Sequence, residues 1–406
     1  MLFLFGYLST WLNNDWKATA VGIVITYLVF IMGIPALIFQ TFIPDSLRGL
    51  YNEKFKKNWW IFSLQIALVL ILFILSAPGL SGDENTPYPY DYLVAITFIM
   101  VAGWILIWGI YYLRGQFESI RDIELRLSKK IMKEAIEAFN KHRKIHETLI
   151  EQMVILAKEL PAGTKRNFFL KECEQLLERL VDVQPKHRDT KLIGEILKDV
   201  VCLSVTYDRD KFNHENMEKV MAILNLVYHQ AYLNGGKEED GSSYLKTTIA
   251  NCIKEIAVNT MLKNDLPAVM DAIEKLSVIE STHNELYVLG SEALRQHHIQ
   301  TAVTAAQKLK GKVISNIDKR GIQNSSDKRL FTVWLGLMAK IYQLGGSARE
   351  FALRQIQLVI EHISVGQSGE IRSLFADTRK HFYQQAEFST IDAVKALEQT
   401  LFGTAD

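Results

Sequence analysis

The stretch Ile253–Leu276, IKEIAVNTMLKNDLPAVMDAIEKL, aligns without gaps to Leu286–Leu309, LYVLGSEALRQHHIQTAVTAAQKL, which lies 33 residues further along the chain. Apolar residues coincide at eight positions of this alignment, from Ile253 with Leu286 to Leu276 with Leu309. A third copy is expected from Trp334 onward, after an insertion. A period of about 33–34 residues, with two helices in each copy, is typical of a helical repeat array.

Helical patterns extend from this repeat to both sides. Apolar residues recur at three-to-four spacing, breaks carry Gly, Pro or Asn, and no bounded run of period two predicts a strand. The sequence therefore predicts an all-α domain over 161–406, an α-solenoid of paired helices. The expected helices are 164–182, 189–206, 213–233, 243–263, 265–278, 283–296, 299–316, 327–344, 347–363, 368–385 and 389–402.

The small and aromatic residues of the repeat carry a resemblance to a known family. The region 253–363 resembles tetratricopeptide-type repeats, although His297 or Gln343 stands where that family has a small residue, and the closing proline is missing. The resemblance implies a concave surface that binds a peptide or a protein. Its candidate contact residues are Leu289, Gly290, Ala293, Ala302, Trp334 and Tyr342.

The N-terminal part of the chain has a different composition. Residues 1–113 hold five of the 46 Lys and Arg residues and six of the 45 Asp and Glu residues. Three apolar stretches there, at about 18–42, 59–77 and 92–113, have the roughly 20 residues needed to cross a bilayer. We expect a three-helix transmembrane domain over 17–113, preceded by an interfacial amphipathic segment at 1–16.

Loop charges predict the orientation of the spans. The first connection, 43–58, carries four Lys or Arg residues, and the second, 78–91, carries three acids and no base. The positive-inside rule puts the first connection and the C-terminal domain in the cytoplasm and the N-terminus outside. We expect an integral protein of a plasma membrane such as the bacterial inner membrane, with its three cysteines on the reducing side.

The segment after the third span is predicted to be one long stalk helix. Apolar residues continue at three-to-four spacing from 114 to 160, and the series Pro161-Ala162-Gly163 ends the pattern. Small residues four apart in the spans permit close helix packing, and we expect a homo-oligomer.

No catalytic, cofactor or metal motif emerges from the sequence. His142 and His146 are four apart, but Arg143 and Lys144 between them would repel a cation, and no zinc-protease glutamate accompanies them. The pair His297-His298 reads as a helix turn, and the glycine-rich stretch 235–243 lacks phosphate-loop spacing. The near-zero net charge excludes a polybasic nucleic-acid binder. We expect neither an enzyme nor a bound cofactor.

Two functions remain open. The first is a membrane-anchored scaffold or adaptor whose helical repeats recruit a cytoplasmic protein partner. The alternative is an oligomeric membrane pore, or a membrane-perturbing effector, gated by the cytoplasmic helical domain. The pore would be closed by hydrophobic constrictions, since the spans carry no charged residue at mid-membrane.

Overall fold

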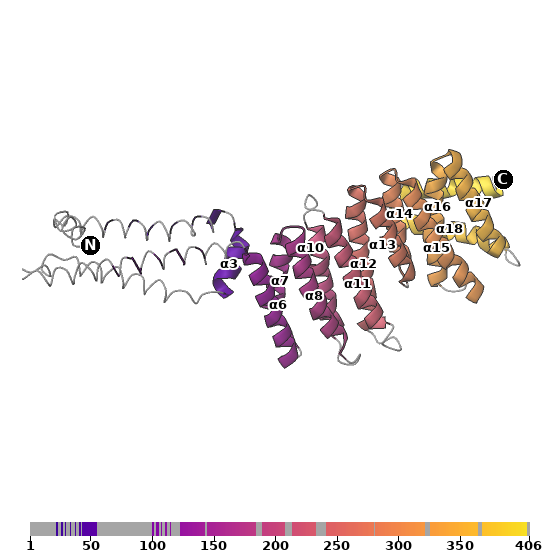
Figure 1. The fold of residues 1–406 in the computed structure, drawn as a ribbon. Coiled ribbons are helices and arrows are strands. Elements are labelled where there is room, and N and C mark those ends of the chain that lie inside the picture. The colour runs from indigo at the N-terminus through magenta and orange to yellow at the C-terminus, as the bar shows by residue number, and fades with distance from the viewer. Residues whose placement is uncertain are drawn as a thin grey trace, which may run out of the picture. The chain divides into compact units, whose positions relative to one another are not determined.

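The computed structural model describes residues 122–142, 144–183, 189–207, 213–232, 241–279, 281–320, 325–363 and 368–403, together with 43–54 and single positions within 22–41 and 100–114. The chain divides into two units, 1–159 and 160–406. The described residues form helices and contain no strand, so the prediction of an all-α fold is confirmed for them (Figure 1).

The predicted membrane domain falls almost wholly outside the described residues. The interfacial segment 1–16 and the span 59–77 lie outside them entirely, and the spans 18–42 and 92–113 are described only at single positions. None of the helices found in the described part of the chain combines the length and the apolar character that a bilayer crossing requires.

The predicted stalk helix over 114–160 is wrong in one respect. The structure has two helices there, α6 (Ile123–His142) and α7 (Glu147–Glu159), which pack against each other. Buried residues such as Leu127, Ile131 and Leu156 line their facing sides, so the hairpin removes from water an apolar stripe that one straight helix would expose.

A third helix completes the described part of this unit. The short helix α3 (Asp45–Lys54), from the predicted first connection, packs on both α6 and α7. Its side chains Leu47 and Leu50 are buried, and Ser46 Oγ donates a hydrogen bond to Glu159 Oε1 over 2.9 Å. Residues from before and after the second and third predicted spans are therefore in direct contact.

The second unit is a series of antiparallel helices (Figure 1). The breaks between them lie where the sequence predicts them. The helices are α8 (Thr164–Val181), α9 (Thr190–Glu195), the π-helical segment η4 (Ile196–Cys202), α10 (Leu203–Thr206), α11 (His214–Tyr232), α12 (Gly241–Leu262), α13 (Leu266–Val278), α14 (His283–Arg295), α15 (Ile299–Arg320), α16 (Ser325–Gln343), α17 (Gly346–Ile363), α18 (Ser368–Gln384) and α19 (Phe388–Phe402).

The 33-residue repeat reappears in the turn geometry of two helix pairs. Asn264 between α12 and α13 and His297 between α14 and α15 are 33 residues apart and have φ angles of 60° and 62°. The next backbone N–H donates to the carbonyl five residues earlier in both turns, from Asp265 to Thr260 and from His298 to Ala293. This is the Schellman arrangement that ends a helix with a left-handed residue. His297 is thus the left-handed residue of a turn that backbone hydrogen bonds hold together. Such a turn does not require a small side chain at this position.

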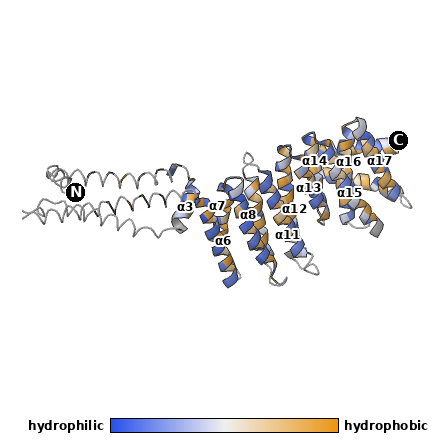
Figure 2. Cartoon of the chain, viewed as in Figure 1, coloured by the Kyte–Doolittle hydropathy of each residue, from blue (hydrophilic) through white to orange (hydrophobic). Residues whose placement is uncertain are grey.

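The helix pairs stack in two layers. Helices α12, α14 and α16 pack on one another, and α13 packs on α15 in the second layer. Glycines allow the close crossings: a Cβ at Gly290 would lie 2.6 Å from Leu337 Cδ2, and one at Gly336 would clash with the ring of Phe382. Figure 2 shows hydrophobic and hydrophilic residues mixed along the labelled helices of this unit, as expected where each helix buries one side against neighbours.

Candidate functional site

The residues that the sequence nominated for partner contact lie inside the helix array. Leu289, Gly290 and Ala293 are on α14, Ala302 is on α15, and Trp334 and Tyr342 are on α16; all six are buried. These side chains pack the helices of the array against one another, and their burial keeps them from direct contact with a partner. A partner that binds near them would touch the exposed residues around them.

Two of these residues have clear packing roles. The indole of Trp334 is fully buried, with its ring centroid 5.6 Å from that of Phe331. The hydroxyls of Tyr342 and Thr400 lie 2.8 Å apart, which joins α16 to α19, and the guanidinium of Arg349 lies 4.8 Å from the centre of the Tyr342 ring. The contact of Tyr342 with Thr400 therefore fixes α16 against α19, whereas the contact of Trp334 with Phe331 lies within α16.

A polar cluster also joins α14, α16 and the start of α19. Tyr287 Oη and Lys340 Nζ donate to Glu387 Oε2 over 2.5 and 2.9 Å, and Lys340 lies 4.6 Å from the centre of the Tyr287 ring. Burial opposes the charge of the Glu387 carboxylate, but the hydrogen bonds from Tyr287 and Lys340 prevail and lower its pKa. Burial and the bond to Glu387 raise the pKa of Tyr287. The groups satisfy one another, as expected of a structural ion pair.

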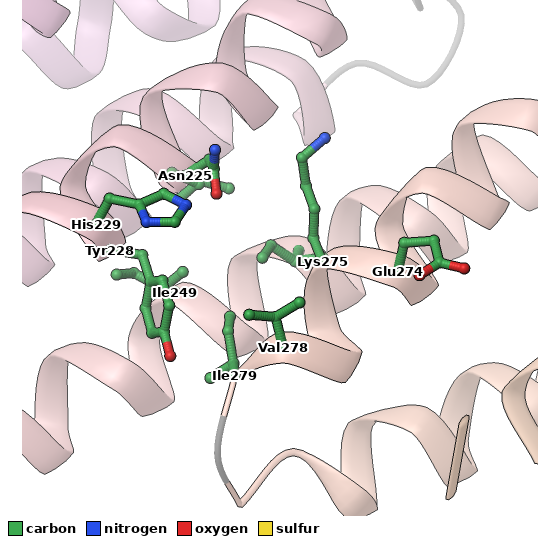
Figure 3. Close-up of a pocket in the computed structure, with 10 residues that line it drawn as sticks. Asn225, Tyr228, His229, Ile249, Glu274, Lys275, Val278 and Ile279 are labelled. Atoms are coloured by element: carbon green, nitrogen blue, oxygen red, sulfur yellow. The ribbon is translucent and has the colours of Figure 1, made fainter. Parts of the chain in front are cut away.

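A groove elsewhere in the array has the features of a binding site. It lies among α11, α12 and α13, and its cavity volume is about 260 Å³ (Figure 3). Its lining residues are Leu224, Asn225, Tyr228, His229, Ile249, Ile253, Glu274, Lys275, Val278 and Ile279.

The lining divides into an apolar floor and a polar rim. Leu224, Ile249 and Ile253 are buried, whereas Asn225 and His229 are exposed. Figure 3 shows Asn225 and His229 across the opening from Lys275, with Val278 and Ile279 beneath. Such a site takes apolar groups on its floor, and the rim offers hydrogen bonds that orient them.

Aromatic residues of α11 form one wall of the groove and continue beyond it. The ring centroids of Tyr228 and Tyr232 lie 5.0 Å apart, and the ammonium of Lys246 lies 4.7 Å from the centre of the Tyr232 ring. Tyrosine is enriched at protein interfaces because it joins a large apolar surface to a hydroxyl that can stay in contact with water.

The size and the chemistry of the groove limit what it can hold. A volume of about 260 Å³ is smaller than the roughly 300–1,000 Å³ of the pockets that bind small molecules and cofactors. The lining combines apolar side chains with one imidazole, one amine, one carboxylate, one amide and one phenol, and it includes neither Ser nor Cys as a nucleophile. The groove suits one or two side chains presented by a peptide.

The histidine pairs take other positions. His142 ends α6 and His146 lies just before α7, so the two do not share a helical face. His297 and His298 form the turn described above, as the sequence predicts. Within the described ranges, no three or more His, Cys, Asp or Glu residues are grouped so that they could hold a metal ion.

Sequence reasoning missed the groove because its residues come from three helices. One signal was present: Leu224, Tyr228 and Tyr232 recur every four residues on α11, which puts two tyrosines on the same side of one helix.

Comparison of the chain with protein families, curated proteins and solved structures finds no match to any of them.

Proposed function

We propose that this chain is a membrane-anchored helical-repeat adaptor. Its α-solenoid recruits a cytoplasmic protein partner, and the α11–α13 groove takes one or two apolar side chains of that partner. The observation that carries the proposal is the groove itself, with its buried apolar floor, its tyrosine wall and its polar rim. The stacking of helix pairs in two layers supports the assignment to a solenoid, an architecture whose long surfaces serve protein binding.

The contact of α3 with α6 and α7 supports the membrane topology. Two segments that touch must lie on the same side of a bilayer, so the chain between residues 54 and 122 crosses an even number of times. The two spans predicted there, 59–77 and 92–113, meet this requirement. The basic residues of both segments favour the cytoplasmic side.

Single described positions within the predicted spans also support membrane insertion. Val29, Leu37, Met100, Ile107 and Ile110 are helical and expose large apolar side chains, which favour lipid or another protein over water. The hydroxyls of two threonines donate to carbonyls four residues earlier, from Thr26 to Gly22 over 2.8 Å and from Thr41 to Leu37 over 2.7 Å. Internal hydrogen bonds of this kind are what a hydroxyl needs in hydrocarbon.

Site-specific photocrosslinking tests the proposal in intact membranes. A photoreactive phenylalanine analogue replaces Val278 in the groove or, as the control, Val288 on α14; their side chains are 68% and 43% exposed. The adaptor predicts a discrete protein adduct from position 278 and none of the same mass from position 288. Adducts that are absent from 278, or identical at both positions, would exclude recruitment through the groove.

A second measurement separates the adaptor from the pore. The membrane potential is followed in cells that overproduce the full-length chain. The adaptor predicts an unchanged potential, because no solute crosses the spans. Depolarisation that depends on the three spans would favour the oligomeric pore or membrane-perturbing effector.

A further inference from the structure

The fold brings together two cysteines that lie 50 residues apart in sequence. Cys202 ends the π-helical segment η4, Cys252 lies within α12, and both are buried. Cys202 Sγ lies 3.8 Å from the carbonyl oxygen of Cys252, to which the thiol donates a hydrogen bond. Cys252 Sγ in turn lies 3.9 Å from the carbonyl oxygen of Leu197. The third cysteine, Cys173, is buried in α8.

The two elements that carry the pair pack directly on each other. η4 and α12 are in contact, and Thr206 Oγ1 donates to the carbonyl of Cys202 over 3.1 Å just after the π-helical segment. π-helical turns interrupt α-helices at a cost in hydrogen-bond geometry and occur often at functional sites. Here the segment ends at the cysteine that faces α12.

One side of the pair leads to the surface. Glu255 is exposed, and its Oε2 lies 3.8 Å from Cys202 Sγ. A carboxylate at this position can accept the proton of the thiol, and its exposure connects the sulfur to water. Cys202 is therefore the thiol whose proton has a route to the surface, and we assign it the first step.

The surroundings also set the speed of any reaction. The neighbouring side chain of Cys252 and burial raise the pKa of the Cys202 thiol well above its ordinary value, and the charge of Glu255 acts in the same direction. Because the thiolate is the reactive form, oxidation near neutral pH is slow and accelerates as the pH rises.

We propose that Cys202 and Cys252 are an oxidation site that a peroxide converts into a disulfide between η4 and α12. Cys202 Sγ loses its proton and attacks one oxygen of the peroxide, the O–O bond breaks, and the released hydroxide takes up the proton as water. Cys202 is then a sulfenic acid. Cys252 Sγ attacks this sulfur, the S–O bond breaks, and the second hydroxide leaves as water with the thiol proton. The two thiols lose two electrons and the peroxide gains them.

The proximity of the thiols favours the second step. Attack by Cys252 is intramolecular, between groups that the packed elements already hold together, so it competes well with further oxidation of the sulfenic acid. Cys252 lies between the groove residues Ile249 and Ile253 in sequence, so the bond would tie down the helix that forms the groove floor. The disulfide itself does not depend on what the groove binds.

The test uses the full-length protein, reduced and reconstituted in lipid nanodiscs. It is treated with hydrogen peroxide, denatured in the presence of an alkylating reagent, digested and analysed by mass spectrometry. We expect a cross-linked peptide pair that contains Cys202 and Cys252, with Cys173 alkylated. The rate of its formation should increase roughly tenfold per pH unit while the thiol is protonated.

Serine variants supply the controls. C252S should lose the cross-link and leave Cys202 as a sulfenic acid that reacts with dimedone, whereas C173S should form the cross-link as the wild type does. Peroxide treatment that oxidises methionines but leaves Cys202 and Cys252 fully alkylated would overturn the proposal. So would an equal yield of links to Cys173. Both results come from the wild-type chain, so they hold even if a serine variant fails to fold.

Discussion

Helix pairs α12–α13 and α14–α15 share a sequence pattern and a turn, yet only the first pair borders the groove. Val278 and Ile279 end the second helix of the first pair, and Gly311 and Lys312 take the equivalent positions 33 residues later. Lys312 Nζ donates to the carbonyl of Ile279 over 2.6 Å and contacts Thr282 Oγ1 at 3.0 Å. A charged side chain therefore forms a bridge at a position where the first pair has the exposed apolar side chain of Val278 nearby.

The difference between the two pairs shows how one repeat keeps a groove open while the next repeat closes the equivalent space. A second bridge, from Lys308 to Glu274 over 2.6 Å, joins α15 to α13, which also pack directly on each other. Equivalent apolar positions hold both pairs together. The substitutions that distinguish them lie at the end of α13 in the first pair and at the equivalent positions within the longer helix α15 in the second. The backbone repeat supplies the scaffold, and a few side chains decide whether the space between helices is closed.

The largest effect should come from shortening equivalent core residues. Leu286 is fully buried in the second pair, and its equivalent Ile253 lines the groove. We expect L286A to cost about 2–5 kcal/mol of unfolding free energy, and I253A to cost less, because Ile253 borders an existing cavity and has fewer contacts to lose. Urea unfolding of the full-length protein in detergent, followed by circular dichroism, measures both. An equal or larger cost for I253A would contradict the open groove.

Glycine substitutions should act in opposite directions at two places in the second pair. Gly290 corresponds to Ala257 in the first pair, but a Cβ there would lie 2.6 Å from Leu337 Cδ2. We expect G290A to destabilise by about 1–3 kcal/mol through overpacking. A Cβ at Gly311 meets nothing within 4 Å, so G311A should stabilise α15 by about 0.5–1 kcal/mol. The same unfolding measurement compares them, and a stabilising G290A would show that the crossing has spare room.

Removing the amine of Lys312 should leave the second pair without its bridge, as the first pair is. K312M deletes the hydrogen bonds to Ile279 and Thr282, and we expect a loss of about 0.5–1.5 kcal/mol. The hydroxyl of Thr282 keeps its bond to the carbonyl of Leu276, so no buried group is left unpaired. K328M at an exposed lysine of α16 is the control and should change stability little. A K312M protein as stable as K328M would show that the bridge contributes nothing.

His283 should make a smaller, pH-dependent contribution in the second pair alone, since Ala250 is its equivalent in the first. Burial lowers the pKa of His283 to about 4, and the positive charges of Arg329, Lys312 and His381 act in the same direction. The unfolded chain binds this proton at higher pH than the folded one, so stability falls as the pH drops from about 6.5 to 4 and is unaffected above.

The comparison of wild type with H283Q isolates the contribution of His283 to the pH dependence of stability. Unfolding free energies measured at several pH values should decline more steeply towards acid in the wild type than in H283Q. Parallel curves would show that His283 titrates normally. In K312M, the pKa of His283 followed by NMR should move upward, because one positive neighbour is gone.

Much of the fold could be predicted from the sequence because its signals are local. Three-to-four spacing and Gly, Asn or Pro breaks predict the helices from α8 to α19, and the 33-residue repeat predicts equivalent turns at Asn264 and His297. The break between α6 and α7 was missed because neither Gly nor Pro marks it. Weaker signals were present: Lys141 and His142 in the last turn of α6 and Glu147 in the first turn of α7 each suit the helix dipole.

The sites could be predicted far less well because they are assembled across helices. Repeat motifs identify packing positions, and so Leu289, Ala293 and Trp334 proved to be buried. The groove joins residues from 224 to 279, and the contact between Cys202 and Cys252 spans 50 residues of sequence. Neither arrangement follows from spacing along one helix.

The central claim, that the open groove of the first pair recruits a protein partner, is tested most directly by matched charge variants. Full-length V278K and V288K are purified from membranes with their bound proteins, and the partner identified by crosslinking is quantified. Lysine at the C-terminal end of α13 suits the helix dipole, so V278K should fold normally. The adaptor predicts that V278K loses the partner at least tenfold relative to wild type, about 1.4 kcal/mol, while V288K retains it. Equal capture by V278K and the wild type would contradict the claim.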